Sequence, residues 1–187
     1  MHDPTEEDWM AVKRIFRYLQ STKKFRLKYS TENSEILGYS DASYASDSKD
    51  RKSTSGYIFI SNGPISWRSK KQPIVSISSM EAEYIALVDA AKEGIWLLRL
   101  ASEINSEKSP KVILLEDNQA AIKLAKNEIL SDRSKHIDVR FHFLRHHVQA
   151  GTIELRYCST EKMVADALTK PLQRVKLSQH VADMSLN

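Results

Sequence analysis

An aspartate stands in the middle of the strand-like stretch ILGYSDASYAS, residues 36–46. Strands disfavour Asp because its short carboxylate competes for backbone hydrogen bonds and is costly to desolvate. Side chains alternate along a strand, so Asp41 shares a face with Leu37 and Tyr39 and is expected to be buried there. A divalent metal ion would make such a buried charge tolerable.

Three more acids occupy positions from which they could meet Asp41. Asp117 lies between the apolar strand KVILLE and a helix, Glu81 opens a long helix, and Asp166 lies on a short one. In mixed α/β sheets, functional groups gather where strands end and connections diverge. Carboxylates gathered there would repel one another, and Mg²⁺, which prefers hard oxygen ligands, would offset the repulsion. The topology therefore suggests a metal site made of Asp41, Glu81, Asp117 and Asp166.

Each acid except Asp41 also has an ordinary interpretation. Asp117 is well placed to be only a helix N-cap, and Glu81 and Asp166 could be surface acids in a chain with 24 acidic residues. In MEAEY, Glu81 and Glu83 point about 200° apart on a helix, so they cannot both reach one site. Nearness to the helix start favours Glu81 and leaves Glu83 as a structural or surface acid.

The elements that must position these acids follow from hydrophobic periodicity. Three strands come first, at 36–45, 54–61 and 64–69, followed by a helix at 80–104, a strand at 111–116, helices at 117–127 and 135–149, a strand at 152–157 and a helix at 161–170. This β-β-β-α-β-α-α-β-α order predicts an α/β fold with a three-stranded meander and then α/β crossovers. An amphipathic helix at 4–24 precedes them, with Thr5 and Asp8 as a capping box.

The length of the chain predicts one domain with an appendage, or at most two small domains. The chain has 187 residues, of which 41% are apolar, and a net charge of +4 with a pI near 9.1, so a polyanionic partner is permitted but not required. The single cysteine, Cys158, excludes an internal disulfide and a cysteine zinc cluster. No signal peptide and no membrane-spanning run is found, so we expect a soluble intracellular protein.

Several blocks of the sequence carry a resemblance to a known family. These blocks are GYSDASYASDSKDRKSTSGYIFI, ISWRSKKQPIVSISSMEAEYIAL, EDNQAAIKLAKN, SKHIDVRFHFLR and VADALTKPL. In order and spacing they resemble the ribonuclease H region of copia-type (LTR) retrotransposon Pol polyproteins, from about Ile36 to Leu172. Residues 1–30 resemble the last helix of the preceding reverse transcriptase. The implied organisation is a reverse-transcriptase remnant at 1–30, a ribonuclease H domain at 31–172 and a C-terminal tail at 173–187; removing 1–30 should leave the rest folded.

The resemblance implies a ribonuclease H-like fold with a five-stranded mixed sheet flanked by helices. It also implies an endonuclease, a hydrolase that cuts the RNA strand of an RNA–DNA hybrid with two Mg²⁺ ions, or Mn²⁺ in their place, and leaves 5′-phosphate and 3′-hydroxyl ends. The catalytic and metal-binding residues carried over are Asp41, Glu81, Asp117 and Asp166. The implied partners are the hybrid and the reverse transcriptase domain of the same polyprotein, with no membrane. The implied location is the cytoplasm, within the retrotransposon particle, or the nucleus.

Two further sets of residues are candidate contacts for the substrate. Polar side chains beside the acids could reach the RNA 2′-hydroxyl, although helix capping explains them equally well: Ser78, Ser79, Asn118 and Gln119. Basic residues could hold phosphates: Arg51, Lys52, Lys70 and Lys71.

Some residues depart from the family pattern, and two other functions stay open. Glu116 is such a departure and adds a negative charge beside Asp117, whereas His136 in SKHID belongs to the family's block and is expected to cap its helix. One alternative is a non-catalytic relic or domesticated module that binds nucleic acid or protein, although all four carboxylates are retained. The other is an integrase or transposase of the same fold, which typically uses three acids and brings a DNA-binding domain, for which the sequence shows no motif.

Overall fold

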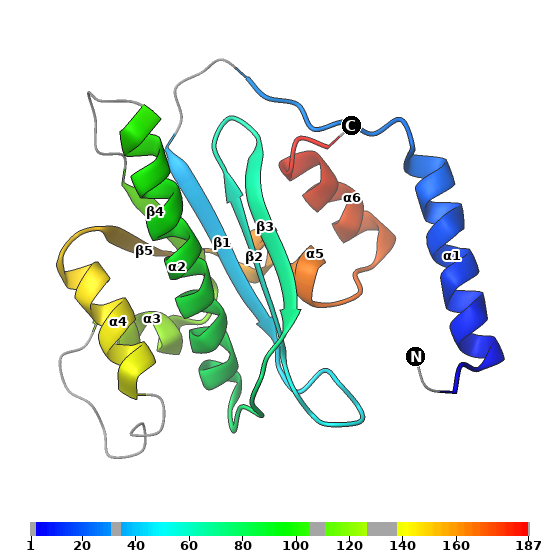
Figure 1. Cartoon of the computed structure of the whole chain (residues 1–187), viewed down its shortest axis with the longest axis horizontal. Coiled ribbons are helices and arrows are strands. Elements are labelled where there is room, and N and C mark those ends of the chain that lie inside the picture. Colours follow the sequence, from blue (N-terminus) through cyan, green and yellow to red (C-terminus); the bar gives the residue numbers. More distant parts are fainter. Residues whose placement is uncertain (1–2, 31–34, 105–110, 127–137, 187) are drawn as a thin grey trace.

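A computed structural model of the chain describes residues 3–30, 35–104, 111–126 and 138–186 (Figure 1). His136, for which a capping role was predicted, lies outside the described residues. None of the helices in the described ranges combines the length and the apolarity that crossing a membrane requires.

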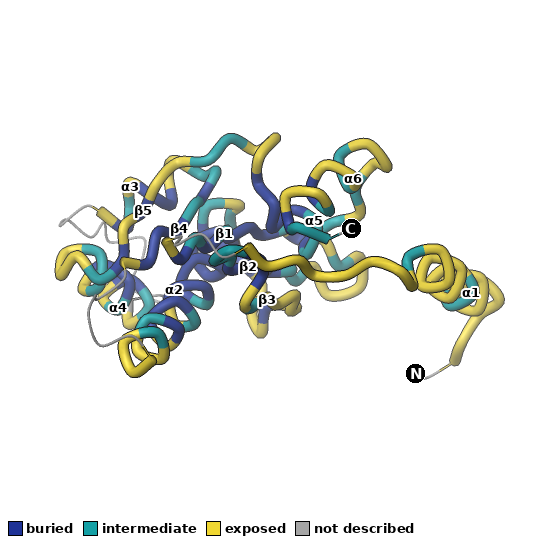
Figure 2. The backbone as a smooth tube through the Cα atoms, turned by 90° about the horizontal axis from the view of Figure 1, so that it is seen from above, coloured by how far each residue is buried: buried dark blue, intermediate teal, exposed yellow. Residues whose placement is uncertain are grey.

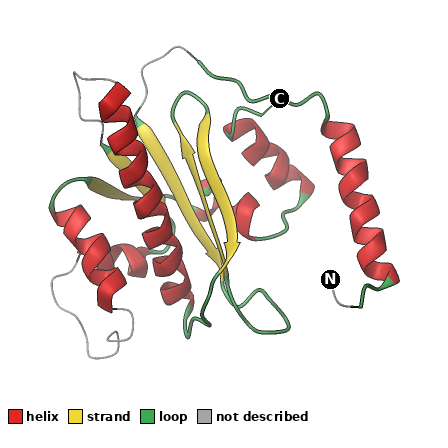
Figure 3. Cartoon of the chain, in the orientation of Figure 1, coloured by secondary structure: helices red, strands yellow, loops and turns green. Residues whose placement is uncertain are grey.

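One five-stranded mixed sheet forms the centre of the molecule, as predicted (Figure 3). Its strands are β1 (Ile36–Ser43), β2 (Thr54–Ile60), β3 (Pro64–Lys71), β4 (Val112–Glu116) and β5 (Ile153–Tyr157). They lie in the order β3-β2-β1-β4-β5. The first three strands are antiparallel neighbours, and β4 is parallel to both β1 and β5. The crossover thus places the carboxyl end of β4 beside β1, where Asp117 follows β4.

The helices agree with the predicted order, with two differences late in the chain. They are α1 (Glu6–Thr22), α2 (Ser79–Ile104), α3 (Gln119–Lys126), α4 (Asp138–Gln149), α5 (Asp166–Thr169) and α6 (Arg174–Asp183). The helix predicted at 161–170 is wrong as one element: a 3-10 turn at Thr160–Lys162 and α5 replace it, because Met163 between them has extended backbone. The tail, for which no element was predicted, contains α6.

Two layers of side chains cover the two faces of the sheet. Tyr57 and Phe59 of β2 belong to the main core, which α2, α3 and α4 complete. Ile58, between them in the strand, points to the other face and packs with Val164 and Met184. Val164 shortly precedes α5 in the chain, and Met184 directly follows α6. This alternation shows that β2 is covered on both faces, in agreement with the apolar residues on both faces of its sequence TSGYIFI.

Helix α1 lies at the periphery, with no buried residue (Figure 2). Its N-terminus has the predicted capping box, since Thr5 and Asp8 each accept the other's backbone N–H. Its apolar stripe is open: Trp9 is 55% exposed and Phe16 64%. The segment after α1 is anchored, because Lys28 N–H donates to Ser185 O at 3.0 Å and the Tyr29 hydroxyl donates to Pro64 O at 2.6 Å.

Candidate active site

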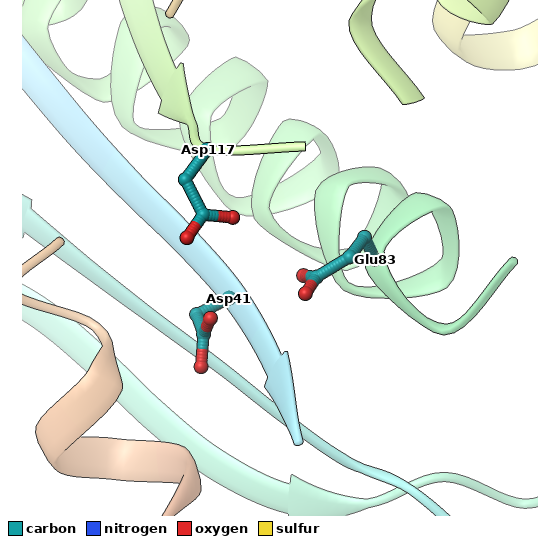
Figure 4. A group of neighbouring side chains, drawn as sticks. All are labelled: Asp41, Glu83 and Asp117. Carbon is teal, nitrogen blue, oxygen red and sulfur yellow. The ribbon is translucent and has the colours of Figure 1, made fainter. Parts of the chain in front are cut away.

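Three carboxylates converge at one end of the central strands (Figure 4). Asp41 comes from β1, Glu83 from α2, and Asp117 follows β4. One carboxylate oxygen from each lies within 4.8 Å of the other two. Among the described residues, this is the group of potential metal ligands that could share one ion. The arrangement suits a hard divalent cation, which prefers carboxylate oxygens.

Asp41 is buried, as the sequence predicted, with 1% of its surface exposed. Burial raises the pKa of this carboxyl to about 6, against the lowering effects of the Thr169 hydroxyl and the Lys170 ammonium group. Thr169 donates to Asp41 Oδ2, and Lys170 Nζ lies 3.8 Å from Oδ1. These contacts come from α5 and its C-cap, on the same face of the sheet as Asp41.

Gly56 is what lets α5 lie so close to Asp41. It stands directly opposite Asp41 in the β1–β2 register. A Cβ atom on Gly56 would lie 2.7 Å from Thr169 Cγ2 and 2.9 Å from Leu168 Cβ, both closer than packed atoms approach. The absent side chain therefore makes room for the helix that carries Thr169.

The helix residue that joins the cluster is Glu83, and the expectation of Glu81 is corrected by this geometry. Glu81 turns back to the start of α2, where its Oε2 accepts the Ile77 N–H at 2.7 Å. The Glu81 N–H in turn donates to the Ser78 hydroxyl at 3.1 Å. Because residues two apart on a helix point about 200° apart, a Glu81 that caps the helix start places Glu83 on the side facing Asp41.

Glu83 has the ligand-like environment that was expected of Glu81. Burial, reinforced by the charges of Asp41 and Asp117, raises the pKa of Glu83 to about 9. Its Oε2 is buried and accepts no hydrogen bond from any described residue. Such an oxygen costs free energy unless a proton or a cation satisfies it. This donor set therefore fits Mg²⁺ or Mn²⁺, with Asp41, Glu83 and Asp117 as the residues that would hold the ion.

Glu116 adds a further buried carboxyl near Glu83. It is 0% exposed, and burial followed by the nearby charge of Glu83 raises its pKa well above the usual range. Its Oε1 accepts the Asn118 N–H at 3.1 Å. The carboxyl that the sequence placed beside Asp117 thus lies inside the protein, where burial favours its neutral form.

Asp117 does not serve as the N-cap of α3, so that interpretation is wrong. The cap is Asn118, whose Oδ1 accepts the Ala121 N–H at 3.0 Å. The Asp117 carboxylate accepts the Thr160 hydroxyl at 2.7 Å and points toward Asp41 and Glu83 (Figure 4). Two consecutive residues between β4 and α3 therefore have different roles: Asn118 caps the helix, and Asp117 presents its carboxylate to the cluster.

Asp166, the fourth predicted ligand, is close to Asp41 but is held differently. It is 0% exposed and contacts two ammonium groups: Lys170 Nζ lies 2.7 Å from its Oδ1, and Lys176 Nζ contacts its Oδ2. Burial by itself would raise the pKa of Asp166, but the two lysines outweigh it, and the pKa is lowered. It is absent from the three-residue group that the described residues form.

The predicted substrate contacts have structural partners of their own in several cases. Ser78 and Asn118 cap helices, as the alternative interpretation held, while Ser79 and Gln119 are the first residues of α2 and α3. Lys71 pairs with Asp47 at 2.5 Å and with Asp50 at 2.9 Å. The remaining basic residues, Arg51, Lys52 and Lys70, lie on the same loop and strand. Their contact with a substrate stays a prediction.

Four residues around the cluster were missed by sequence reasoning: Thr160, Thr169, Lys170 and Lys176. Thr169 and Lys170 lie within the block VADALTKPL, so their position beside Asp166 was an available signal. Lys176 lies outside these sequence blocks, and it reaches the site only because α6 folds back toward it.

Comparisons with known proteins agree with this fold and extend over the whole chain. No model of a protein family matches. The chain is 40% identical over 190 residues to the retrovirus-related Pol polyprotein from transposon TNT 1-94 of Nicotiana tabacum, a match that covers 100% of this chain. It is 41% identical over 177 residues to the one from transposon RE2 of Arabidopsis thaliana, covering 94% of this chain. It spans only 14% and 12% of these two relatives.

A solved structure with the same fold is LC11-RNase H1 in complex with an RNA/DNA hybrid. It matches with a TM-score of 0.52 and 15% sequence identity, over 72% of this chain and 94% of that one. At this identity the likeness concerns the fold, which is ribonuclease H-like as the sequence predicted.

Proposed function

We propose that this chain, which is homologous to a segment of retrovirus-related transposon Pol polyproteins and has the ribonuclease H-like fold, hydrolyses the RNA strand of RNA–DNA hybrids. The observation that carries the proposal is the convergence of Asp41, Glu83 and Asp117 within 4.8 Å, from a strand, a helix and a strand end. A match to a polyprotein segment and to a nuclease bound to such a hybrid supports the same substrate class.

The residues of the chain would prepare the reaction in distinct ways. Asp41, Glu83 and Asp117 would supply carboxylate oxygens for divalent cations, with Asp166 as a further candidate. Mg²⁺ ions bound there would activate the attacking water and stabilise the leaving 3′ oxygen. Thr169 and Thr160 orient Asp41 and Asp117 through their hydroxyls. The expected products carry 5′-phosphate and 3′-hydroxyl ends.

The wider assignments follow from the same homology. We propose that residues 1–30 belong to a preceding reverse transcriptase, which would be the partner of residues 31–172 in one polyprotein. The exposed apolar stripe of α1 supports this division, because Trp9 and Phe16 have no covering layer in the described chain. The setting would be reverse transcription in a retrotransposon particle in the cytoplasm, or the nucleus.

The test is Mg²⁺-dependent cleavage of an end-labelled RNA–DNA hybrid, with duplex DNA and duplex RNA as controls. Wild-type protein should cut only the RNA of the hybrid. Asp117→Asn should reduce cleavage about 100-fold or more, because a loss of metal stabilisation worth several kcal/mol corresponds to at least two factors of ten. It should leave hybrid binding nearly unchanged.

Three outcomes would contradict the proposal or favour its rivals. Hybrid binding without cleavage by the wild type would favour a non-catalytic module. Cleavage of duplex DNA would favour an integrase or transposase. Near-normal turnover by Asp117→Asn would show that the carboxylate cluster is not the catalytic site.

A further inference from the structure

Two ammonium groups lie beside the carboxylate cluster, where they contact Asp166. Lys170 Nζ lies 2.7 Å from Asp166 Oδ1 and 3.8 Å from Asp41 Oδ1, so it bridges the two acids. Lys176 Nζ contacts the other oxygen of Asp166. Asp166 is fully buried, whereas the two lysines are about one third exposed, with side-chain exposures of 34% and 32%. Each oxygen of Asp166 therefore already has a cation.

The two lysines differ in how they reach Asp166. Lys170 follows α5 directly and sits one helical turn after Asp166. Lys176 comes from α6 and also donates to the carbonyl oxygen of Thr160 at 3.1 Å. The position of Lys176 is fixed by the packing of α6. His180 of this helix is fully buried, and Met184, directly after it, packs with Ile58 and Val164.

We propose that Lys176 is an internal cation that competes with a divalent metal ion for Asp166. The proposal rests on the proposed function in one respect, that Asp166 is a candidate metal ligand. A metal ion that binds Asp166 Oδ2 must displace the Lys176 ammonium group or lie beside it, and like charges at contact distance repel. Lys176 thereby weakens metal binding at Asp166, beside the cluster, while it stabilises the fold when metal is scarce. Helix α6 would thus set the metal concentration at which the site fills.

The experiment measures Mn²⁺ binding to the full chain by calorimetry and by electron paramagnetic resonance, without nucleic acid. Lys176→Met should lower the dissociation constant of Mn²⁺ about three- to tenfold, because one repelling charge is removed. The matched control is Arg174→Met, which removes the same charge from an exposed position on the same helix. The control should change the dissociation constant by less than about twofold, since water and salt screen an exposed charge.

A second measurement guards against loss of folding in the variant. In EDTA, Lys176→Met should melt at a lower temperature than the wild type, because buried Asp166 loses a partner. Added Mn²⁺ should raise its melting temperature more than that of the wild type. If Lys176→Met does not fold, the double variant Asp166→Asn/Lys176→Met replaces it. This variant removes both charges of the pair, so it leaves no buried carboxylate that has lost the Lys176 ammonium group. In the Asp166→Asn background, Lys176→Met should affect Mn²⁺ affinity no more than Arg174→Met does.

Unchanged or weaker Mn²⁺ binding by folded Lys176→Met would overturn the proposal. The proposal would also be overturned if Lys176→Met increased Mn²⁺ affinity equally in the wild-type and in the Asp166→Asn background. Because both readouts use Mn²⁺ alone, absence of hybrid cleavage by the wild type would contradict the proposed function and leave the competition between Lys176 and metal standing.

Discussion

A carboxylate oxygen of Glu83 on α2 lies within 4.8 Å of one of Asp41 on β1, although the two residues are far apart in sequence. The contact depends on the start of α2, where Glu81 accepts the Ile77 N–H and thereby sets which side of the helix faces the strand. Two neighbouring glutamates therefore have separate tasks, one in capping and one in the cluster.

Glutamine variants should separate these two tasks. Glu83→Gln keeps the size of the side chain but removes a charge that cations need, so hybrid cleavage should fall about 100-fold or more. Glu81→Gln still presents an oxygen to Ile77 and should retain most of the cleavage. Steady-state rates at saturating Mg²⁺ measure both, with melting temperatures to confirm folding. The reverse pattern would mean that the α2 register in solution differs from this structure.

Metal binding should release protons at neutral pH. With a pKa of about 9, Glu83 holds a proton at pH 7 in the metal-free protein, whereas a metal ligand must be ionised. Calorimetry of Mn²⁺ binding in buffers of different ionisation enthalpy should show a release of about one proton at pH 7. Glu83→Gln should abolish most of this release. A wild-type value near zero would show that Glu83 is already ionised.

The stability of the metal-free protein should fall as the pH rises from about 5 to about 9. In this range, Glu83 keeps its proton in the folded chain but loses it when unfolded, where its pKa returns toward 4.5. The folded state thus binds more protons, and the free energy of unfolding decreases with pH. Asp41, raised to about 6, acts in the same direction up to about that pH. Urea denaturation in EDTA measures the slope, which Glu83→Gln should flatten; a rising stability would contradict the expectation.

Gly56→Ala should disturb the site through α5. The added methyl group would lie 2.7 Å from Thr169 Cγ2, so α5 must shift, at a cost of about 1–3 kcal/mol for overpacking. Stability and hybrid cleavage should both decrease. Adding Thr169→Ser removes the closest clashing atom and keeps the hydroxyl that binds Asp41, so the double variant should recover part of both. If Thr169→Ser gives no recovery, the clash is not the cause.

Removal of residues 1–24 should cost less than about 1 kcal/mol of stability, because α1 has no buried residue. The cut spares Lys28 and Tyr29, whose hydrogen bonds to Ser185 and Pro64 tie this segment to the rest of the chain. Removal of 1–30 deletes these bonds and should cost more, while the remainder still melts cooperatively. Loss of a cooperative melt after the shorter deletion would place α1 in the fold itself.

Local patterns were sufficient for most of the architecture. Hydrophobic periodicity predicted β1–β3, and Asn62 and Gly63, between β2 and β3, both have the positive φ values of a tight hairpin. The buried carboxylate of Asp41 was also foreseeable, since strand alternation places it on an inner face. The helix expected at 161–170 could not be predicted in its observed form, because Met163 has extended backbone and Val164 packs with Ile58 of β2, so tertiary contacts override the local helical pattern.

The sequence by itself determined the order of the elements, the burial of Asp41 and the resemblance to a family, because these depend on neighbouring residues and on short blocks. Only the tertiary structure decided between Glu81 and Glu83, since both are acids at the start of one helix and the choice depends on how that helix is capped and rotated against β1. It alone brought Lys176 to Asp166, through the docking of α6. Contacts between distant segments are set by packing of whole elements, and no local pattern encodes that geometry.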